Sequence, residues 1–279
     1  MVERDQAAAA EANAPSQVSA QETKRTGGAA WPDRLLKKYD VSSYRHAETI
    51  LRHDFPDIFH KLTDVLERFT FPYSFSIVGG GGKGPVARKF DQQLTALGFA
   101  EKRVDVVQII DGRRFESPTH KVDFFRDRVA VELEWNNKTE FYDRDLDNFR
   151  KLHSLGFLSV GVIVTRVTSL NHVFAAIDQL LAQMPFEYHR TTGRQERVTA
   201  ISGKYGQSTT HADKLYPKIE GGAGGQCPLL VFAMKEPVMF DDYTAAIRWA
   251  AAAGRTSVIP DDLPASLPLE ATALDDPQT

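Results

Sequence analysis

The sequence contains a single cysteine and no long hydrophobic run. Cys227 cannot form an internal disulfide, and no second Cys or His lies near it at a spacing typical of zinc sites. No apolar stretch approaches the roughly 20 residues needed to span a bilayer. The first residues also lack the apolar segment of a secretory signal. We therefore expect a cytoplasmic protein with no membrane partner.

The sequence also lacks a strong charge of either sign. The formal net charge is −3, but residues 1–30 carry −1 and residues 261–279 carry −5, which leaves +3 on the body. A mildly basic body binds nucleic acid only if its basic residues gather on one face. The charge balance therefore neither favours nor excludes DNA as a partner.

Composition divides the chain into three parts. Residues 1–30 are rich in Ala, Gln, Ser and Thr, and they predict a disordered N-terminal arm. Residues 259–279 are rich in Pro, Asp and Ala, and they predict an acidic, disordered C-terminal tail. We expect residues 31–258 to form one folded domain, because a hydrophobic fraction of 42% supports one sizeable core.

Apolar periodicity predicts an α/β (α+β) fold, with a mixed central sheet flanked by helices. Helical spacing covers five segments: residues 44–70, 86–97, 140–155, 170–184 and 240–253. Strand patterns cover four: residues 120–125, 128–135, 157–165 and 229–234. The first two strands flank a short turn and predict a hairpin, and the order strand, helix, strand, helix predicts a crossover unit. From the end of the helix at residue 184 to about residue 235, loops are expected to alternate with short strands.

Two glutamates lie on the second strand of this hairpin. Side chains alternate along a strand, so Glu132 and Glu134 share one face while Val131 and Leu133 share the other. Asp123, on the preceding strand, reaches the same region. Converging carboxylates repel one another unless a cation binds, and Mg²⁺ prefers such hard oxygen ligands. The pattern favours a magnesium centre, with a solvated polar face on an edge hairpin as the alternative.

Other kinds of catalytic site find less support. The eight histidines are scattered and no Ser-His-Asp arrangement stands out. Paired glutamates also serve glycosidases, but there they flank a sugar bond from opposite sides. Neighbours two residues apart on one strand are better placed to share a cation.

The spacing resembles a known nuclease core. An Asp, then Glu-x-Glu nine residues later, then a helix and a buried strand, is similar to the PD-(D/E)xK pattern, with Glu134 in place of the usual Lys. Residues 43–51 resemble the pattern Tyr-x-His-Ala-x-x-Ile-Leu of the BglII/BstYI restriction endonuclease family. Residues 208–216 resemble its Ser-Thr-Thr-Tyr-Ala-Asp-Lys-x-Tyr pattern. Together the three stretches identify the chain as a member of that family.

The resemblance implies roles for individual residues. Asp123 and Glu132 match metal-binding carboxylates, and Glu134 matches the third catalytic position. A fourth active-site position upstream falls on Glu101, although the segment between it and Asp123 is longer here, and Glu116 is the alternative.

DNA contacts follow partly from the same resemblance. Asn136 and Asn137 match a polar pair that contacts bases. Lys83 and Arg88, in and after a glycine-rich loop, are candidate phosphate contacts, with a solvated basic loop as the alternative. The loop does not fit the nucleotide-binding template, because Gly84 follows Lys83. His211 replaces a family tyrosine. The other candidate base contacts are Ser169, Asn171, His211, Asp213 and Lys214.

The resemblance also implies an activity and partners. We expect a type II restriction endonuclease that uses Mg²⁺ to cut double-stranded DNA and leaves 5′-phosphate ends. The family works as a homodimer on a palindrome, and GATC is the expected centre, with a four-base 5′ overhang. A cognate DNA methyltransferase belongs to the same system without forming a stable complex. The alternatives are a DNA-binding module without catalysis and a repair nuclease of low specificity.

Overall fold

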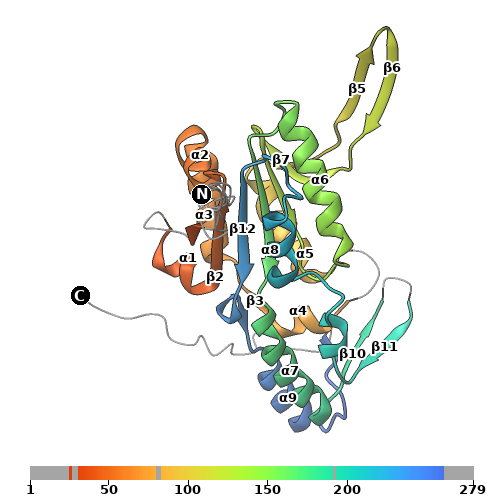
Figure 1. Ribbon diagram of the computed structural model, residues 1–279. Helices are drawn as coiled ribbons and strands as arrows, with labels where there is room; N and C mark the ends of the chain where they lie inside the picture. The colour runs from red at the N-terminus through yellow and green to blue at the C-terminus, as the bar shows by residue number, and fades with distance from the viewer. Residues whose placement is uncertain (1–24, 27–30, 80–82, 191–192, 261–279) are drawn as a thin grey trace, which may run out of the picture.

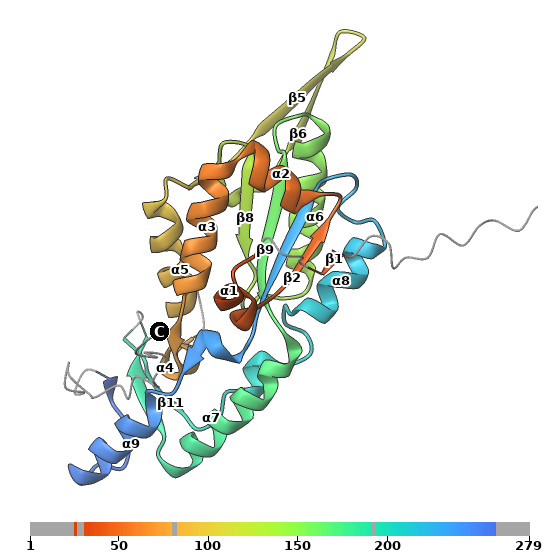
Figure 2. The same ribbon diagram turned by 90° about the vertical axis from the view of Figure 1, so that its left-hand side faces the viewer.

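Seven strands among the described residues form a mixed sheet through the centre of the molecule (Figures 1 and 2). The computed structural model describes residues 25–26, 31–79, 83–190 and 193–260. Across the sheet the order is β1-β2-β12-β9-β8-β7-β4. In that order the strands are Arg25–Thr26, Tyr39–Tyr44, Leu229–Met234, Val160–Arg166, Val129–Leu133, Val122–Arg126 and Ala100–Lys102.

The middle of the sheet is parallel and its outer parts are antiparallel. β12, β9 and β8 pair in parallel, whereas β2 and β7 run antiparallel to their neighbours. Every residue of β9 and β12 is buried. Burial on both faces explains why these two segments are almost continuously apolar. The predicted mixed sheet is confirmed.

Helices cover both faces of the sheet (Figure 2). Val129 and Val131 of β8 face a core shared with α1, α2, α3 and α5, whereas Ala130 faces the core under α6 and α8. The predicted alternation of β8 is therefore present. These helices are α1 Asp33–Lys38, α2 Ala47–Asp54, α3 Pro56–Arg68, α5 Pro85–Ala96, α6 Glu140–Ser154 and α8 Ala212–Glu220.

β8, α6 and β9 form the predicted crossover unit. β8 and β9 pair in parallel from Val129↔Val160 to Leu133↔Val164, and α6 connects them across one face of the sheet. Gly156, with φ of 69°, lies just beyond the end of the helix, in the left-handed region that favours glycine. The crossover places the first turns of α6 over the second half of β8, where the two glutamates lie.

Shorter elements gather beyond the lower end of the sheet in Figure 1. The larger helices there are α7 and α9, and β10 pairs with β11 in a separate ribbon. The elements of this region are β3 Phe71–Pro72, α4 Tyr73–Ile77, η2 Thr168–Leu170, α7 Asn171–Gln183, β10 Phe186–His189, β11 Gln195–Val198, η3 Ser202–Tyr205, η4 Glu236–Val238, β13 Met239–Phe240 and α9 Tyr243–Ala252.

A hairpin arm projects from the opposite end of the molecule (Figure 1). Its strands are β5 Asp105–Ile110 and β6 Arg113–Pro118, paired from Asp105↔Pro118 to Ile110↔Arg113. Asp111 and Gly112 form the turn with φ of 48° and 75°, as a two-residue hairpin turn with two left-handed positions requires. The arm makes up most of the segment between Glu101 and Asp123.

Several sequence-based boundaries need correction. The helix predicted over residues 44–70 is two helices, α2 and α3, because Pro56 begins a new one. Tyr39–Tyr44 forms a strand that the apolar spacing did not reveal, and Ala212–Glu220 is helical where loops and short strands were expected.

Residues 25–26, inside the predicted N-terminal arm, pair with β2. Residues 1–24, 27–30 and 261–279, which make up most of the two predicted terminal segments, lie outside the described residues. Among the described residues no helix is long and apolar enough to cross a membrane.

Candidate active site

The β7–β8 hairpin brings Asp123 next to Glu132. The strands pair with Phe124 opposite Val131, and the next position in this register sets Asp123 across from Glu132. The backbone N–H of Asp123 lies 3.4 Å from both carboxylate oxygens of Glu132. The Asp127-Arg128 turn, with φ of 46° and 69°, fixes the register. Local turn geometry thus sets the spacing of these two carboxylates.

Glu132 and Glu134 are each only 1% exposed. They share the face of β8 that α6 covers, so this face is buried and the solvated-face alternative is wrong. Burial of an ionised carboxylate is costly unless a positive charge or hydrogen-bond donors compensate for it. Asn137 supplies one donor, with Nδ2 3.0 Å from Glu134 Oε2.

The electrostatics of the two glutamates reflect this burial. Burial, together with the neighbouring charge of Asp145, raises the pKa of Glu134 to about 9. Burial likewise raises the pKa of Glu132 well above its usual range, with Asp145 and Asp123 as the next causes. Asp123 lies at the open side of the site, and partial burial raises its pKa too. Without a bound cation, the folded protein therefore favours protonated carboxyl groups here.

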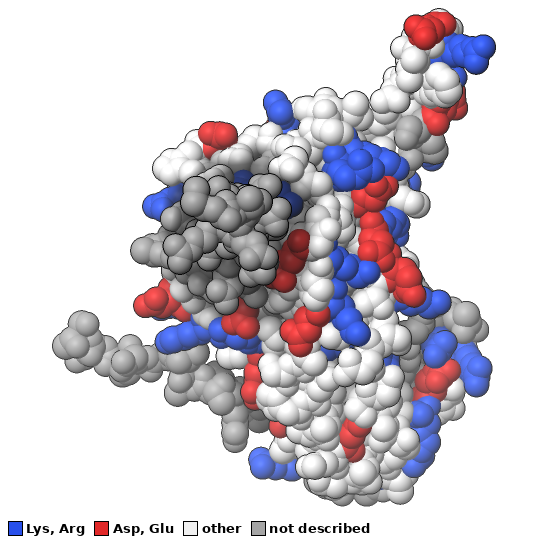
Figure 3. All heavy atoms as spheres, viewed as in Figure 1, with Lys and Arg blue, Asp and Glu red and all other residues white. Residues whose placement is uncertain are grey.

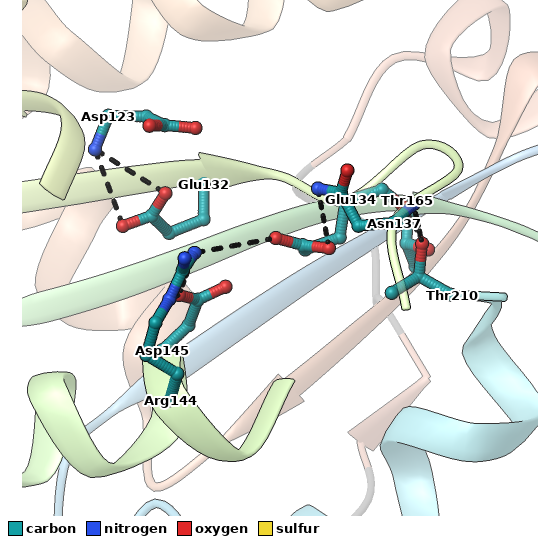
Figure 4. Close-up of polar contacts among 8 residues, drawn as sticks. All are labelled: Asp123, Glu132, Glu134, Asn137, Arg144, Asp145, Thr165 and Thr210. Atoms are coloured by element: carbon teal, nitrogen blue, oxygen red, sulfur yellow. Dashed lines mark hydrogen bonds and ion pairs between the residues drawn. The ribbon is translucent and has the colours of Figure 1, made fainter. Parts of the chain in front are cut away.

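Asp145 of α6 is a further acidic residue, in addition to Asp123, Glu132 and Glu134, and the sequence analysis did not single it out. It is 1% exposed and lies on the buried face of α6 together with Tyr142 and Phe149. Figure 4 shows Asp145 rising from α6 toward β8, with the Arg144 guanidinium between the carboxylates of Asp145 and Glu134. The signal was an acidic residue at a helix position whose periodicity matches the apolar face.

The positively charged side chain of Arg144 reaches Glu134 and Asp145. Its Nη2 lies 2.8 Å from Asp145 Oδ1 and 4.0 Å from Glu134 Oε1. The guanidinium carbon stands 4.3 Å from the centre of the Phe141 ring. Arg144 thus spans the boundary between the buried carboxylates and the solvent-accessible space beside them.

A cavity of about 590 Å³ adjoins the carboxylates. Asp123 and Glu134 line it, and so do the basic residues Lys83, Arg144 and Lys204. Asn136 and Asn137 lie on the same wall. A cavity with acids beside basic residues can hold an anionic group next to a divalent cation, as phosphate chemistry requires.

The sequence matches a known family over most of its length. The model of the family described as restriction endonuclease BglII/BglIII matches residues 39–234. The chain belongs to this family. The match runs from the first residue of β2 to the last of β12, so it contains both carboxylate-bearing strands and α6. A comparison with curated proteins finds no match.

Membership of the BglII/BglIII family makes the chain a nuclease, a hydrolase that acts on DNA. It also implies a divalent metal, which the family generally uses. Within residues 31–79, 83–190 and 193–260, the structure contains no group of three or more His, Cys, Asp or Glu side chains already arranged to bind a metal ion. The available donors nevertheless fit Mg²⁺ chemically, because they are carboxylate oxygens and one buried oxygen, Asp145 Oδ2, has no hydrogen-bond partner in the described structure.

The predicted DNA contacts of this BglII/BglIII-family chain fall into two groups. One lies at the cavity and contains Lys83, Asn136 and Asn137, with Arg88 exposed nearby on α5. The other lies around the start of α7 and α8. Thr168 Oγ1 joins its members, because it lies 3.0 Å from His211 Nδ1 and donates to Asp213 Oδ2 at 2.5 Å. Ser169, Asn171, Asp213 and Lys214 are exposed there, whereas His211 is buried.

The two groups are connected through Asn137. Its backbone N–H lies 3.1 Å from Thr210 Oγ1, and the Thr210 N–H donates to the Asn137 carbonyl at 2.9 Å. The predicted base-contacting segments therefore meet beside Glu134, although they are about 70 residues apart in sequence.

Glu101 and Glu116 lie outside the buried cluster. Glu101 is exposed on edge strand β4, where it forms an ion pair with Lys121. It still acts on Asp123, because its charge contributes to the raised pKa there. Glu116 lies on the exposed arm and pairs with Arg114. The assignment of a fourth position to Glu101 stays a prediction.

Proposed function

We propose that the chain is a Mg²⁺-dependent type II restriction endonuclease that cuts double-stranded DNA at a palindromic site. The observation that carries this proposal is the pair of buried glutamates at the end of β8, with Glu134 at the wall of a cavity that basic side chains also line. Arg144 reaches Glu134 at 4.0 Å but is closer to Asp145, at 2.8 Å, and carboxylates this well buried are suited to a divalent cation.

The chain's own residues have distinct tasks in this proposal. Asp123, Glu132 and Glu134 hold the Mg²⁺, which when bound supplies positive charge at the phosphate and a water of lowered pKa. Asn137 fixes one oxygen of Glu134 by its 3.0 Å hydrogen bond. Lys83 and Lys204 provide positive charge for the DNA backbone at the cavity wall. Cleavage leaves a 5′-phosphate and a 3′-hydroxyl.

Sequence recognition is assigned to polar side chains near the end of β8. Asn side chains pair naturally with adenine edges in the major groove, so Asn136 and Asn137 are the first candidates. Arg88 is assigned to phosphate contact. The second group supplies further contacts through Ser169, Asn171, His211, Asp213 and Lys214. The buried imidazole of His211 has to become accessible to contact a base, so its assignment rests on sequence resemblance more than on its position.

We also propose that the working form is a homodimer. One chain carries one carboxylate cluster and cuts one strand, and a two-fold dimer presents two clusters to two symmetric half-sites. The expected product has a four-base 5′ overhang around a GATC centre, and a cognate methyltransferase protects the host site. Light scattering of the protein on DNA tests the dimer, and a monomer bound to DNA would contradict it.

The experiment that tests the function is digestion of DNA of known sequence with Mg²⁺, followed by sequencing of the fragment ends. We expect discrete fragments whose ends share one palindrome and carry 5′-phosphates. Fragments with unrelated ends would favour a nuclease of low specificity. Specific binding without cleavage would favour a DNA-binding module that has lost catalysis.

The same cleavage assay tests Glu101 as the fourth active-site residue. If Glu101 contacts the reacting groups, Glu101→Ala lowers the cleavage rate roughly 100-fold, as expected for loss of one positioned charged group. A rate within a few-fold of wild type places Glu101 outside those groups.

A further inference from the structure

The strand and helix that flank the site are pinned together by buried hydrogen bonds. Tyr142 Oη lies 2.7 Å from Thr165 Oγ1, and Thr165 Oγ1 donates to the Glu134 carbonyl at 2.9 Å. These contacts join α6, β9 and β8 at one point. They hold Asp145, one turn further along α6, over the same face of β8 that carries Glu132 and Glu134.

Asp145 has one satisfied and one unsatisfied oxygen. Oδ1 accepts from Arg144 Nε at 2.9 Å, whereas the buried Oδ2 has no hydrogen-bond partner among the described residues. Figure 4 shows this side chain extending from α6 toward β8 and the two glutamates, and it is only 1% exposed. A buried carboxylate oxygen without a donor is destabilising by itself, so its retention requires compensation.

The charges around Asp145 do not balance. Glu132, Glu134 and Asp145 are all buried, and in the described structure the cation in contact with Glu134 and Asp145 is Arg144. If all three carboxylates are ionised, one guanidinium cannot neutralise them, and without a further positive charge their burial favours the protonated forms. A divalent cation removes most of the remaining charge and gives the free oxygen a ligand.

We propose that Asp145, contributed by the helix and not by the hairpin, is a fourth carboxylate of the cation centre, and that Arg144 is its counter-ion when no cation is bound. This inference rests on the proposed function. Arg144 competes with the cation for Glu134 and Asp145. When the cation binds, the guanidinium is released toward the cavity that its side chain already lines.

The test measures Ca²⁺ and Mg²⁺ binding without DNA, by calorimetry and by the cation-induced shift in Tm, with folding checked by circular dichroism. D145N is expected to melt higher than wild type without cation, because it relieves repulsion. It is also expected to bind either cation at least about tenfold more weakly, the scale on which loss of a metal-site group acts. The matched control is D147N, on the exposed face of the same helix, where Asp147 pairs with Arg150 and Lys151. It should match wild type in cation affinity.

R144Q gives an independent readout if D145N fails to fold. It is expected to melt lower than wild type without cation and to bind Ca²⁺ more tightly, because the competing charge is gone. Unchanged or weaker Ca²⁺ binding by R144Q would overturn the role of Arg144, and wild-type affinity in D145N would overturn that of Asp145. If wild type cleaves DNA with Mg²⁺ while D145N binds cation normally, only this inference fails. If wild type neither binds cation nor cleaves DNA, the proposed function fails with it.

Discussion

Two hairpins adjacent in sequence distribute their side chains in opposite ways. β7–β8 lies inside the sheet and places Glu132 and Glu134 in a buried layer. β5–β6 projects from the body and exposes apolar side chains, with Ile109 74% exposed. Figure 3 shows the arm carrying both acidic and basic residues, and the rest of that face mixes the two signs as well.

The exposed apolar side chains of the arm and the buried carboxylates of the β7–β8 hairpin differ in their energetic cost. Exposed apolar side chains on an arm cost little in the folded state, because they are exposed in the unfolded chain as well. Buried carboxylates cost several kcal/mol each in order of magnitude unless they are protonated, paired or bound to a cation. The buried hairpin therefore carries the stronger signal of function.

The largest expected effect is the loss of DNA cleavage after a substitution in the buried β7–β8 hairpin. Glu132→Gln should lower the rate of DNA cleavage by at least about 100-fold, because it removes a charged group that positions the cation. The matched change on the arm, Glu116→Gln, should leave the rate within a few-fold of wild type. Rates are compared on the same DNA under single-turnover conditions, and binding in Ca²⁺ is measured as a control. Near wild-type cleavage by Glu132→Gln would contradict the assignment.

The second prediction concerns pH in the absence of cation. The raised pKa of Glu134, about 9 against an ordinary value of 4.5, means that the folded state holds a proton that the unfolded state has released. This contribution to stability is complete below pH 4.5 and is lost as pH rises toward 9. Tm measured in a chelator should therefore fall with rising pH across this window, and Glu134→Gln should flatten the fall. The same slope in wild type and variant would show that other groups control it.

A smaller effect is expected on the binding of the cognate DNA site. A bidentate Asn–adenine contact discriminates by roughly 1–3 kcal/mol, so Asn137→Ala should weaken binding to the cognate site and leave non-specific binding nearly unchanged. Filter or fluorescence binding in Ca²⁺ measures both affinities. Equal losses on the two DNAs would indicate a phosphate contact, or a folding defect caused by loss of the Asn137–Thr210 contacts.

The smallest effect belongs to the arm. Phe115→Ala should change the free energy of unfolding by no more than about 0.5 kcal/mol, as is usual at exposed positions. Phe124→Ala, in the buried hairpin, should cost about 3–5 kcal/mol, because Phe124 is packed in the core against Phe90. Denaturant unfolding measures both. A large loss from Phe115→Ala would show that the arm packs against another surface in solution.

Much of the sheet could be predicted because its strands have strong local patterns. The alternation in β8 and the apolar runs of β9 and β12 identified the strands and the face of Glu132 and Glu134. β2 was missed because Ser42 and Ser43 interrupt its apolar pattern, and α8 was missed because Pro217 interrupts its helical pattern. The local signal of the arm is the Asp111-Gly112 pair, which is typical of a tight hairpin turn, but only the residues before it are apolar, because Arg113 and Arg114 follow.

Asp145 could not be assigned from the sequence alone. Helical periodicity puts it on the apolar side of α6, but only the packing of α6 on β8 shows that it lies beside Glu132 and Glu134. The second group of predicted DNA contacts is similar, because no local pattern reveals that Thr168 lies between His211 and Asp213. Contacts between distant segments require the tertiary structure.

The most direct test of the central claim is the cation dependence of cleavage by the wild-type chain. Linear DNA of known sequence is incubated with Mg²⁺, without added metal and with a chelator, and the fragments are resolved and their ends sequenced. The account predicts discrete fragments with 5′-phosphate ends in Mg²⁺ and intact DNA in the other two samples. Equal cleavage in the chelator, or none under any condition, would contradict it.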